Sequence, residues 1–543
     1  MNGSGIDTSA LLTMLGLIAA VWALVPSTAR LSFQLSLSRL DWAIIWGALF
    51  AIHVLYFEPV LRDRGLYWVI GPWRWGFDKG GAQYLLFLAL AGFVYLRSRR
   101  TRLNRRNLPL FEKLATSLLH SRKFEELATL LDHHLEATMA FANADSISGR
   151  VATWLQPPLL PIVLDKGEDG QITIRSASQS RLALLGSWLR TRAARAIGPA
   201  QGPRQRARTV VRTLLSSRDF VAYLALARPY LCLNVAERAG MILEEFEDEF
   251  FEALLANESS VIYSELKNSQ NLTGGAGHRL AIPEENRLLA FYLKDVTVAA
   301  KLGVYRSVGE AVLSRIDADD ALLAKLNGPL FTYPEAGKYR CPVFAGISFF
   351  GIMILEGLHQ RLPDHLWLHY FPHFSRKLVS RARDLRSDDQ NHEFPTPLCY
   401  LLYELVASTR DWIDDGIPLT EGDALVDPDA RDGMHILISF EAAQAMGRIL
   451  EPILCSPQLT QGLKVELLTM TMRTLAELRH YPRLARLESA LRESLITPYD
   501  TSINASYVKE LRISFDEVDH ILRAELQSFD LALTEAEDKA RGL

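Results

Sequence analysis

The sequence has little cysteine, with four in 543 residues and no two in a CxxC pair. This scarcity excludes a disulfide-stabilised scaffold and a metal site built from paired cysteines. Isolated cysteines of this kind behave as small apolar residues. We therefore predict four buried, reduced thiols in a cytoplasmic region: Cys232, Cys341, Cys399 and Cys455.

A large net charge is also absent. The chain has 59 Lys and Arg against 63 Asp and Glu, which gives a net charge of −4. This balance excludes a globally basic nucleic-acid-binding protein, although a local basic site remains compatible with it. With 49% hydrophobic and 22% charged residues, the chain is not wholly disordered. Its length predicts about three to four domain-sized units.

The common signatures of nucleotide-binding proteins and hydrolases are missing. The sequence contains no Walker A motif, no GxGxxG after a strand and no GxSxG at a strand–helix turn. These absences favour a protein that is not an enzyme, although an enzymatic alternative stays open, and we expect no cofactor and no metal site.

Charge is missing from three stretches of the first hundred residues, at 10–25, 42–57 and 80–96. A helix that spans a bilayer needs about 20 mostly apolar residues, and a soluble helix usually carries a polar stripe. We predict three transmembrane helices, at about 10–26, 41–58 and 80–97, in a membrane domain of residues 1–106. His53 is the ionisable residue of the second stretch, and we predict it as a polar site inside the membrane.

Six arginines and no acidic residue follow the third stretch: Arg97, Arg99, Arg100, Arg102, Arg105 and Arg106. Basic residues beside a spanning helix stay in the cytoplasm. The pattern predicts an inner (plasma) membrane protein whose N-terminus is outside and whose large C-terminal region is cytoplasmic. The same arginines form a predicted membrane-surface site for the lipid bilayer.

From residue 107 onward the sequence predicts a mainly α-helical fold. Segments 118–135, 214–231 and 475–491 each show leucines, a short polar break with arginine, an aromatic residue and leucines at helical spacing. This pattern is typical of helical hairpins in a solenoid-like array. The Gly-containing loop within 160–174 predicts one small β-hairpin. We expect helical domains at 107–266 and 267–500, and an amphipathic C-terminal helix at 501–543, which either docks on its own domain or mediates oligomerisation.

Arginine is strongly segregated between residues 171 and 218, where ten arginines occur without any Asp, Glu or Lys. Arginine suits bidentate contacts with phosphate groups. We predict an exposed Gly/Pro-broken loop that binds nucleic acid, a nucleotide or anionic lipid, the alternative being a solvated basic face. The candidate residues are Arg190, Arg192, Arg195, Arg204, Arg206 and Arg208.

Three functions are compatible with these patterns. The leading hypothesis is a membrane-anchored sensor or scaffold that binds an anionic ligand, a protein partner or further copies of itself. The first alternative is an oligomeric membrane effector or channel subunit gated by its cytoplasmic region. The second is a membrane-anchored metal-dependent nuclease, which rests on the weak pair Glu265 and Lys267.

Overall fold

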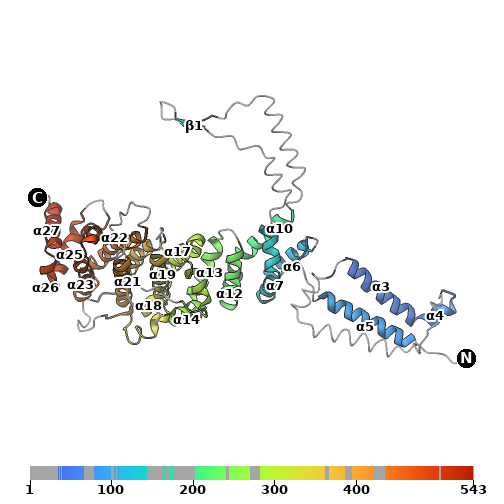
Figure 1. Cartoon of the computed structure of the whole chain (residues 1–543). Helices are drawn as coiled ribbons and strands as arrows, with labels where there is room; N and C mark the ends of the chain where they lie inside the picture. Colours follow the sequence, from blue (N-terminus) through green and yellow to red (C-terminus); the bar gives the residue numbers. More distant parts are fainter. Residues whose placement is uncertain are drawn as a thin grey trace. The chain divides into compact units, whose positions relative to one another are not determined.

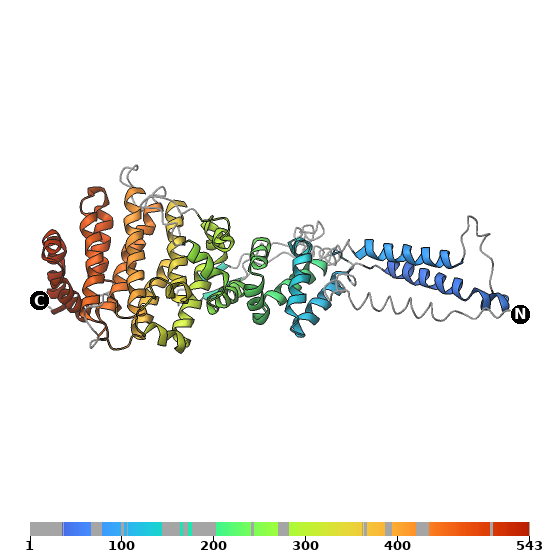
Figure 2. The same ribbon diagram turned by 90° about the horizontal axis from the view of Figure 1, so that it is seen from below.

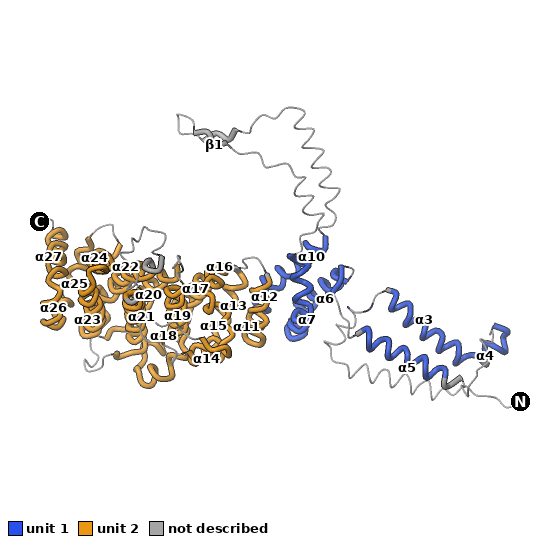
Figure 3. Tube along the Cα trace, in the orientation of Figure 1, with its two compact units in different colours: residues 1–220 blue, residues 221–543 orange. Residues whose placement is uncertain are grey.

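The computed structural model divides the chain into two compact units, residues 1–220 and 221–543 (Figure 3). It is mainly α-helical (Figure 1). The structure describes residues 35, 37, 39–66, 79–98, 103–105, 107–143, 163–166, 172–175, 202–239, 244–269, 282–360, 362, 366–385, 394–419, 434–499 and 503–541.

The first unit contains a pair of apolar helices, α3 (Arg39–Tyr56) and α5 (Lys79–Ser98), with the short helix α4 (Glu58–Asp63) between them in the chain. The two long helices pack against each other, and the start of α3 contacts the end of α5, so the pair is antiparallel (Figure 1). The segment predicted as the first transmembrane helix lies outside the described residues.

The same unit contains a bundle of α6 (Leu108–His120), α7 (Phe124–Asn143) and α10 (Gly202–Leu215). Helix α10 packs on both α6 and α7 through an apolar face, whose residues recur at a spacing of three and four. Two short strands, β1 (Val163–Lys166) and β2 (Ile172–Arg175), pair antiparallel on either side of the predicted loop, with Val163 opposite Arg175. Helix α11 (Arg218–Ala227) continues into the second unit.

Described residues of the second unit form a succession of helices. They are α12 (Pro229–Ala239), α13 (Glu244–Ala256), α14 (Val261–Asn268), α15 (Arg287–Leu293), α16 (Val296–Leu302), α17 (Val304–Ala318), α18 (Asp320–Leu326), η2 (Gly337–Arg340), α19 (Pro342–Gln360), η3 (Leu366–His369), α20 (Tyr370–Ser380), α21 (Pro397–Leu419), α22 (Met434–Leu454), α23 (Gln461–Leu478), η5 (Pro482–Leu484), α24 (Ala485–Ile496), α25 (Ala505–Asp516), α26 (His520–Glu525) and α27 (Gln527–Arg541).

These helices stack in the order of the sequence. Helix α13 packs on α17, α17 on α19, α19 on α21, α21 on α22, α22 on α24, and α25 on α27. Figure 2 shows the stack as a progression of colours from green to red. Each helix contacts a few others that are close to it along the chain, which is the arrangement of a solenoid-like array.

Aromatic side chains fill the core of this stack. The ring of Phe251 lies against those of Tyr292 and Phe349, with centroids 5.4 Å and 5.7 Å apart. Phe350 stacks on Phe374 at 6.2 Å. These rings belong to α13, α15, α19 and α20, so a single aromatic cluster joins four helices.

Local sequence signals begin and end the helices. The Asp295 side chain accepts a hydrogen bond from the Thr297 amide and caps α16, and Thr460 caps α23 through the Leu463 amide. Gly303 ends α16 and precedes α17 with φ of +68°, a left-handed conformation that favours glycine. Capping and glycine placement therefore set the lengths of these short helices.

The predicted helical hairpins are confirmed at two of the three segments, where α6 packs on α7 and α23 packs on α24, and at 214–231 the structure has the predicted break between two helices. Helix α6 gives way to α7 after three residues, α10 to α11 after two, and α23 to α24 through the short 3₁₀ helix η5. Arg122 in the first of these turns has φ of +55°, so a non-glycine residue adopts the left-handed conformation there.

The prediction of an exposed loop around Arg204, Arg206 and Arg208 is wrong. These residues lie in the first half of α10. Pro203 is tolerated in the first turn of a helix, where its missing N–H has no partner to lose, and the Gln, Arg and Ala that follow are favourable helix residues. The Gly–Pro pair therefore marks the start of a helix rather than an interruption.

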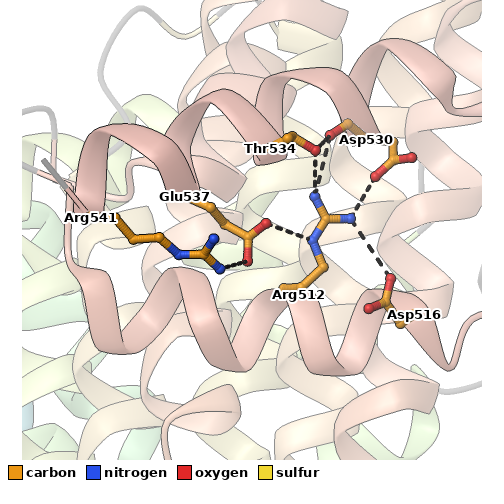
Figure 4. A network of polar contacts seen from close by, with 6 residues as sticks. All are labelled: Arg512, Asp516, Asp530, Thr534, Glu537 and Arg541. Carbon is orange, nitrogen blue, oxygen red and sulfur yellow. Dashed lines mark hydrogen bonds and ion pairs between the residues drawn. The ribbon is translucent and has the colours of Figure 1, made fainter. Parts of the chain in front are cut away.

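The C-terminal segment also differs from its prediction as one amphipathic helix. It forms α25, α26 and α27, because Asp519 caps a new helix through the Ile521 amide. The Arg512 guanidinium joins α25 to α27 by contacts with Asp530, Thr534 and Glu537, and Glu537 also pairs with Arg541 (Figure 4). The segment thus docks on its own unit.

Helix lengths do not support three transmembrane helices. Among the described residues, a single helix, α19, is long and apolar enough to cross a membrane, and 72% of that stretch is buried inside the second unit. The aromatic cluster explains its apolar composition, so α19 is a core helix. The apolar parts of α3 and α5, Leu40–Tyr56 and Ala82–Arg97, fall short of 18 residues.

Candidate functional site

The α3–α5 pair exposes a broad apolar surface. Ile45 and Ala82 are buried, whereas many large apolar side chains on both helices are more than one-third exposed. On a soluble protein, contiguous apolar patches of this kind are rare unless they bind a partner or a membrane. The exposed residues are Leu40, Trp42, Ile44, Trp46, Phe50, Tyr84, Leu85, Leu88, Tyr95 and Leu96.

An ion pair joins α3 to α5 at one end of the two helices. The Arg97 Nε donates a 3.0 Å hydrogen bond to Asp41 Oδ2, and the Asp41 side chain is only 8% exposed. Beside it, the Asn107 side-chain amide donates to the Leu35 carbonyl at 2.9 Å. These contacts gather the start of α3, the end of α5 and the residue before α6. The Arg-rich segment that connects α5 to α6 therefore begins and ends at one end of the helix pair.

Two of the six predicted membrane-surface arginines lie among the described residues. Arg97 occupies the last turn of α5, and Arg105 is exposed in the connection to α6. Arg99, Arg100, Arg102 and Arg106 lie outside the described residues.

His53 is exposed on α3, and its Nδ1 lies 2.8 Å from the Leu49 carbonyl oxygen of the preceding turn. The helix itself provides a hydrogen-bond partner for this nitrogen. This contact within its own helix accounts for the polar ring nitrogen of His53, and no ion pathway is needed to explain it.

Helix α10 carries the described part of the Arg-rich block. Arg206 lies 3.7 Å from the Glu112 carboxylate on α6, and the Arg208 Nε donates to the Ala142 carbonyl of α7 at 2.9 Å. Arg206, Arg208 and Arg212 are exposed, and Arg204 is half-buried. Arg190, Arg192 and Arg195 lie outside the described residues. The structure thus gathers half of the predicted anion-binding residues on one helix.

Glu265 has a structural role. It lies in α14 and is buried, and its two carboxylate oxygens accept hydrogen bonds from the Leu288 and Leu289 amides at 3.1 Å and 2.9 Å. These amides belong to the first turn of α15, so the carboxylate caps that helix. Burial raises the pKa of Glu265. Lys267 is exposed on another side of α14, and the pair is not arranged as a metal-nuclease centre.

Histidines and acidic residues form no metal centre in the part of the chain that the structure describes, where no group of three metal-binding side chains is close enough to hold an ion. His369 and His373 flank the start of α20, and burial lowers the pKa of His373. His365 lies outside the described residues. Asp411, Asp414 and Asp415 lie in α21, and burial together with the Glu477 charge raises the pKa of Asp414 to about 7.

A small pocket between α12 and α15 in the second unit is not predictable from the sequence. Its cavity volume is about 290 Å³, and Asn234, Glu237, Arg287 and Lys294 contribute to its lining. The Arg287 guanidinium lies 4.2 Å from the centroid of the Tyr230 ring. These residues are about fifty positions apart in the chain and share no motif, so only the packing of the two helices reveals the pocket.

No family model, curated protein or solved structure matches this chain.

Proposed function

We propose that this protein is a membrane-anchored scaffold. Helices α3 and α5 contribute to the anchor, and the helical stack of the second unit provides the binding surface in the cytoplasm. The observation that carries the proposal is the apolar surface exposed by α3 and α5. Full burial of a large apolar side chain contributes about 1.5–3 kcal/mol. The ten side chains are 44–75% exposed, so their transfer into hydrocarbon favours the bound state by on the order of 10 kcal/mol.

Helix dimensions agree with this anchor once the polar ends are included. With a rise of 1.5 Å per residue, the 18 residues of α3 extend about 27 Å and the 20 residues of α5 about 30 Å. The hydrocarbon core of a bilayer is about 30 Å thick. A small mismatch is accommodated by local thinning of the bilayer.

The charges at the ends of the helices favour one orientation. Asp41 and Arg97 pair at the end of the helix pair where the Arg-rich segment begins. Because clustered arginines favour the cytoplasmic side, this end faces the cytoplasm in the proposal, and the α4 end faces the opposite side. The second unit then follows in the cytoplasm.

A scaffold role is supported by the construction of the second unit. A stack of helices that pack on their chain neighbours provides an extended surface and requires no catalytic group. The strongest candidate for catalysis, Glu265, is engaged in capping α15. Protein partners and further copies of the chain are the occupants that we propose for this surface.

The anchor is tested by alkaline extraction of membranes from cells that express the full chain. We expect the wild-type protein to remain in the membrane pellet. Replacement of Phe50 and Leu88 by Lys, at exposed positions of α3 and α5, should release it as a folded protein. The matched control replaces Ile521 and Leu531, which are equally exposed in the second unit, by Lys and should stay in the pellet. Extraction of the wild-type protein into the soluble fraction would overturn the proposal.

A further inference from the structure

Helix α10 presents a row of arginines along the edge of its packed face. Ala207, Val210 and Leu214 face α6 and α7 and are buried. Arg208 and Arg212 are exposed and stand four residues apart, and Arg204 precedes them at the same spacing. Residues at this spacing are neighbours along one side of a helix, so the three side chains form a ridge about 12 Å long.

Glu112 of α6 is an acidic neighbour of α10. The Arg206 guanidinium lies 3.7 Å from Glu112, but the two side chains are 52% and 32% exposed, so solvent screens the pair. Arg208 uses its Nε to bind the Ala142 carbonyl, which orients the guanidinium and leaves its two terminal nitrogens able to contact another acceptor. No Asp or Glu occurs between residues 171 and 218. Helix α10 therefore carries four arginines and no acidic residue of its own.

The chain holds this ridge close to the proposed anchor. Helix α5 ends at Ser98 and α6 begins at Leu108, so the connection reaches at most roughly 35 Å. Asn107 shortens this reach, because its side chain binds the Leu35 carbonyl four residues before α3 begins. The α6–α7–α10 bundle is thus confined to the region beside one end of the α3–α5 pair.

We infer that the arginine ridge of α10 binds anionic lipid headgroups on the cytoplasmic surface next to the anchor. Exposed guanidinium groups bind phosphate oxygens, and the surface potential of an anionic leaflet attracts basic segments that lie within a Debye length of it. The inference rests on the proposed membrane anchor and adds to it a lipid-dependent position for the first helical bundle. Anionic lipid would then draw this bundle onto the bilayer.

The test uses the full chain in nanodiscs that contain a headgroup quencher, made either from phosphatidylcholine alone or with 30% phosphatidylglycerol. A fluorophore on Thr209→Cys, in a Cys455→Ser background, reports the position of α10. We expect about twofold stronger quenching in the anionic discs and loss of this difference in 0.5 M NaCl.

Arg212→Glu, which reverses the charge at the exposed end of the ridge, should reduce the quenching to the phosphatidylcholine level. Arg208 is kept because its Nε binds α7. The control, Lys113→Gln with Lys123→Gln, removes the same charge from exposed positions of α6 and the following turn and should leave the lipid effect unchanged.

The outcomes separate the inference from the anchor. Failure of the chain to enter the discs overturns both. Entry followed by quenching that is independent of lipid charge, or unchanged in the arginine variant, overturns the inference alone. Tight binding of a short DNA duplex in phosphatidylcholine discs, lost in the arginine variant, would assign the ridge to nucleic acid and also overturn it.

Discussion

The Tyr292 hydroxyl donates a 2.9 Å hydrogen bond to Glu247 Oε2, and both side chains are buried in the core of the second unit. Burial raises the pKa of Glu247 to about 7, although the hydrogen bond from Tyr292 opposes this shift. The same burial raises the pKa of the Tyr292 hydroxyl, which therefore stays protonated. A carboxyl group that titrates near neutral pH thus lies inside the helical stack.

Glu247 should make the stability of the protein depend on pH. Its pKa in the folded state lies above the ordinary value of 4.5, so the folded state binds more protons than the unfolded state between pH 4.5 and pH 7. The contribution of Glu247 to the free energy of unfolding is therefore greatest below about pH 4.5. It falls as the pH rises and reaches its lowest level above about pH 7. Glu247→Gln should flatten this dependence and raise the free energy of unfolding at pH 8 by up to about 3 kcal/mol.

Denaturant titrations at pH 5, 6, 7 and 8 measure this effect. The control is Glu245→Gln, an exposed residue of the same helix, which should change stability by less than about 0.5 kcal/mol. Parallel pH profiles for the wild-type protein and Glu247→Gln would contradict the prediction.

Gly447 allows the backbones of α22 and α24 to meet. A Cβ atom at this position would lie 1.9 Å from the Ser494 carbonyl oxygen, and backbone atoms cannot move aside as a flexible side chain can. Gly447→Ala should therefore lower the free energy of unfolding by about 3 kcal/mol or more, through overpacking. Gly462→Ala is the matched control, because a Cβ there has open space in the first turn of α23, and it should be neutral or stabilising. Equal melting temperatures for the two variants would refute this explanation.

Arg512 should stabilise the C-terminal helices far more than its neighbour Arg541 does, although both contact Glu537. The Arg512 side chain is 17% exposed and also contacts Asp530 and Thr534, whereas that of Arg541 is 65% exposed. Arg512→Ala should cost about 2–3 kcal/mol, because it removes the charge-assisted hydrogen bonds to Asp530 and to Glu537, whose side chain is 18% exposed. Arg541→Ala should cost about 0.5 kcal/mol or less. Hydrogen exchange of α25 and α27 measures the difference, and equal protection in the two variants would count against the prediction.

The ion pair between Asp41 and Arg97 should fix the pairing of α3 with α5. Asp41→Arg should loosen the pair by about 1 kcal/mol, because it places two like charges together. Asp41→Arg combined with Arg97→Asp should recover most of this loss. Disulfide trapping between cysteines introduced in α3 and α5, in detergent-solubilised protein, reports the pairing. A double variant that is no better than Asp41→Arg would exclude a direct interaction between the two side chains.

Much of the helical fold is predictable from local sequence. Leucines at a spacing of three and four residues, an intervening break and a following aromatic residue located α6–α7, α10–α11 and α23–α24. The division of the C-terminal segment was not predictable in the same way. The helical spacing of apolar residues continues past Asp519, although the helix α25 ends before it and a new helix, α26, begins after it. Capping by Asp519 overrides the periodic pattern there.

Candidate sites were harder to predict because their chemistry depends on tertiary contacts. The pattern around Glu265 suggested a metal ligand, whereas the packing of α14 on α15 makes this carboxylate a helix cap. The apolar composition that predicted membrane helices is shared by α19, which is buried in protein instead. Hydropathy alone does not distinguish hydrocarbon from a protein core, and it is the exposure of residues such as Trp46 and Phe50 that separates α3 from the buried helix α19.

The order of packing in the second unit also bears on how the chain is synthesised. Because α13 pairs with α17, α19 with α21 and α22 with α24, each layer finds its partners soon after it leaves the ribosome. Such local contacts favour rapid folding from the N-terminal end, one layer after another during translation. The apolar helices α3 and α5 emerge before any of these layers, so the nascent chain can be directed to its destination while the stack is still being made.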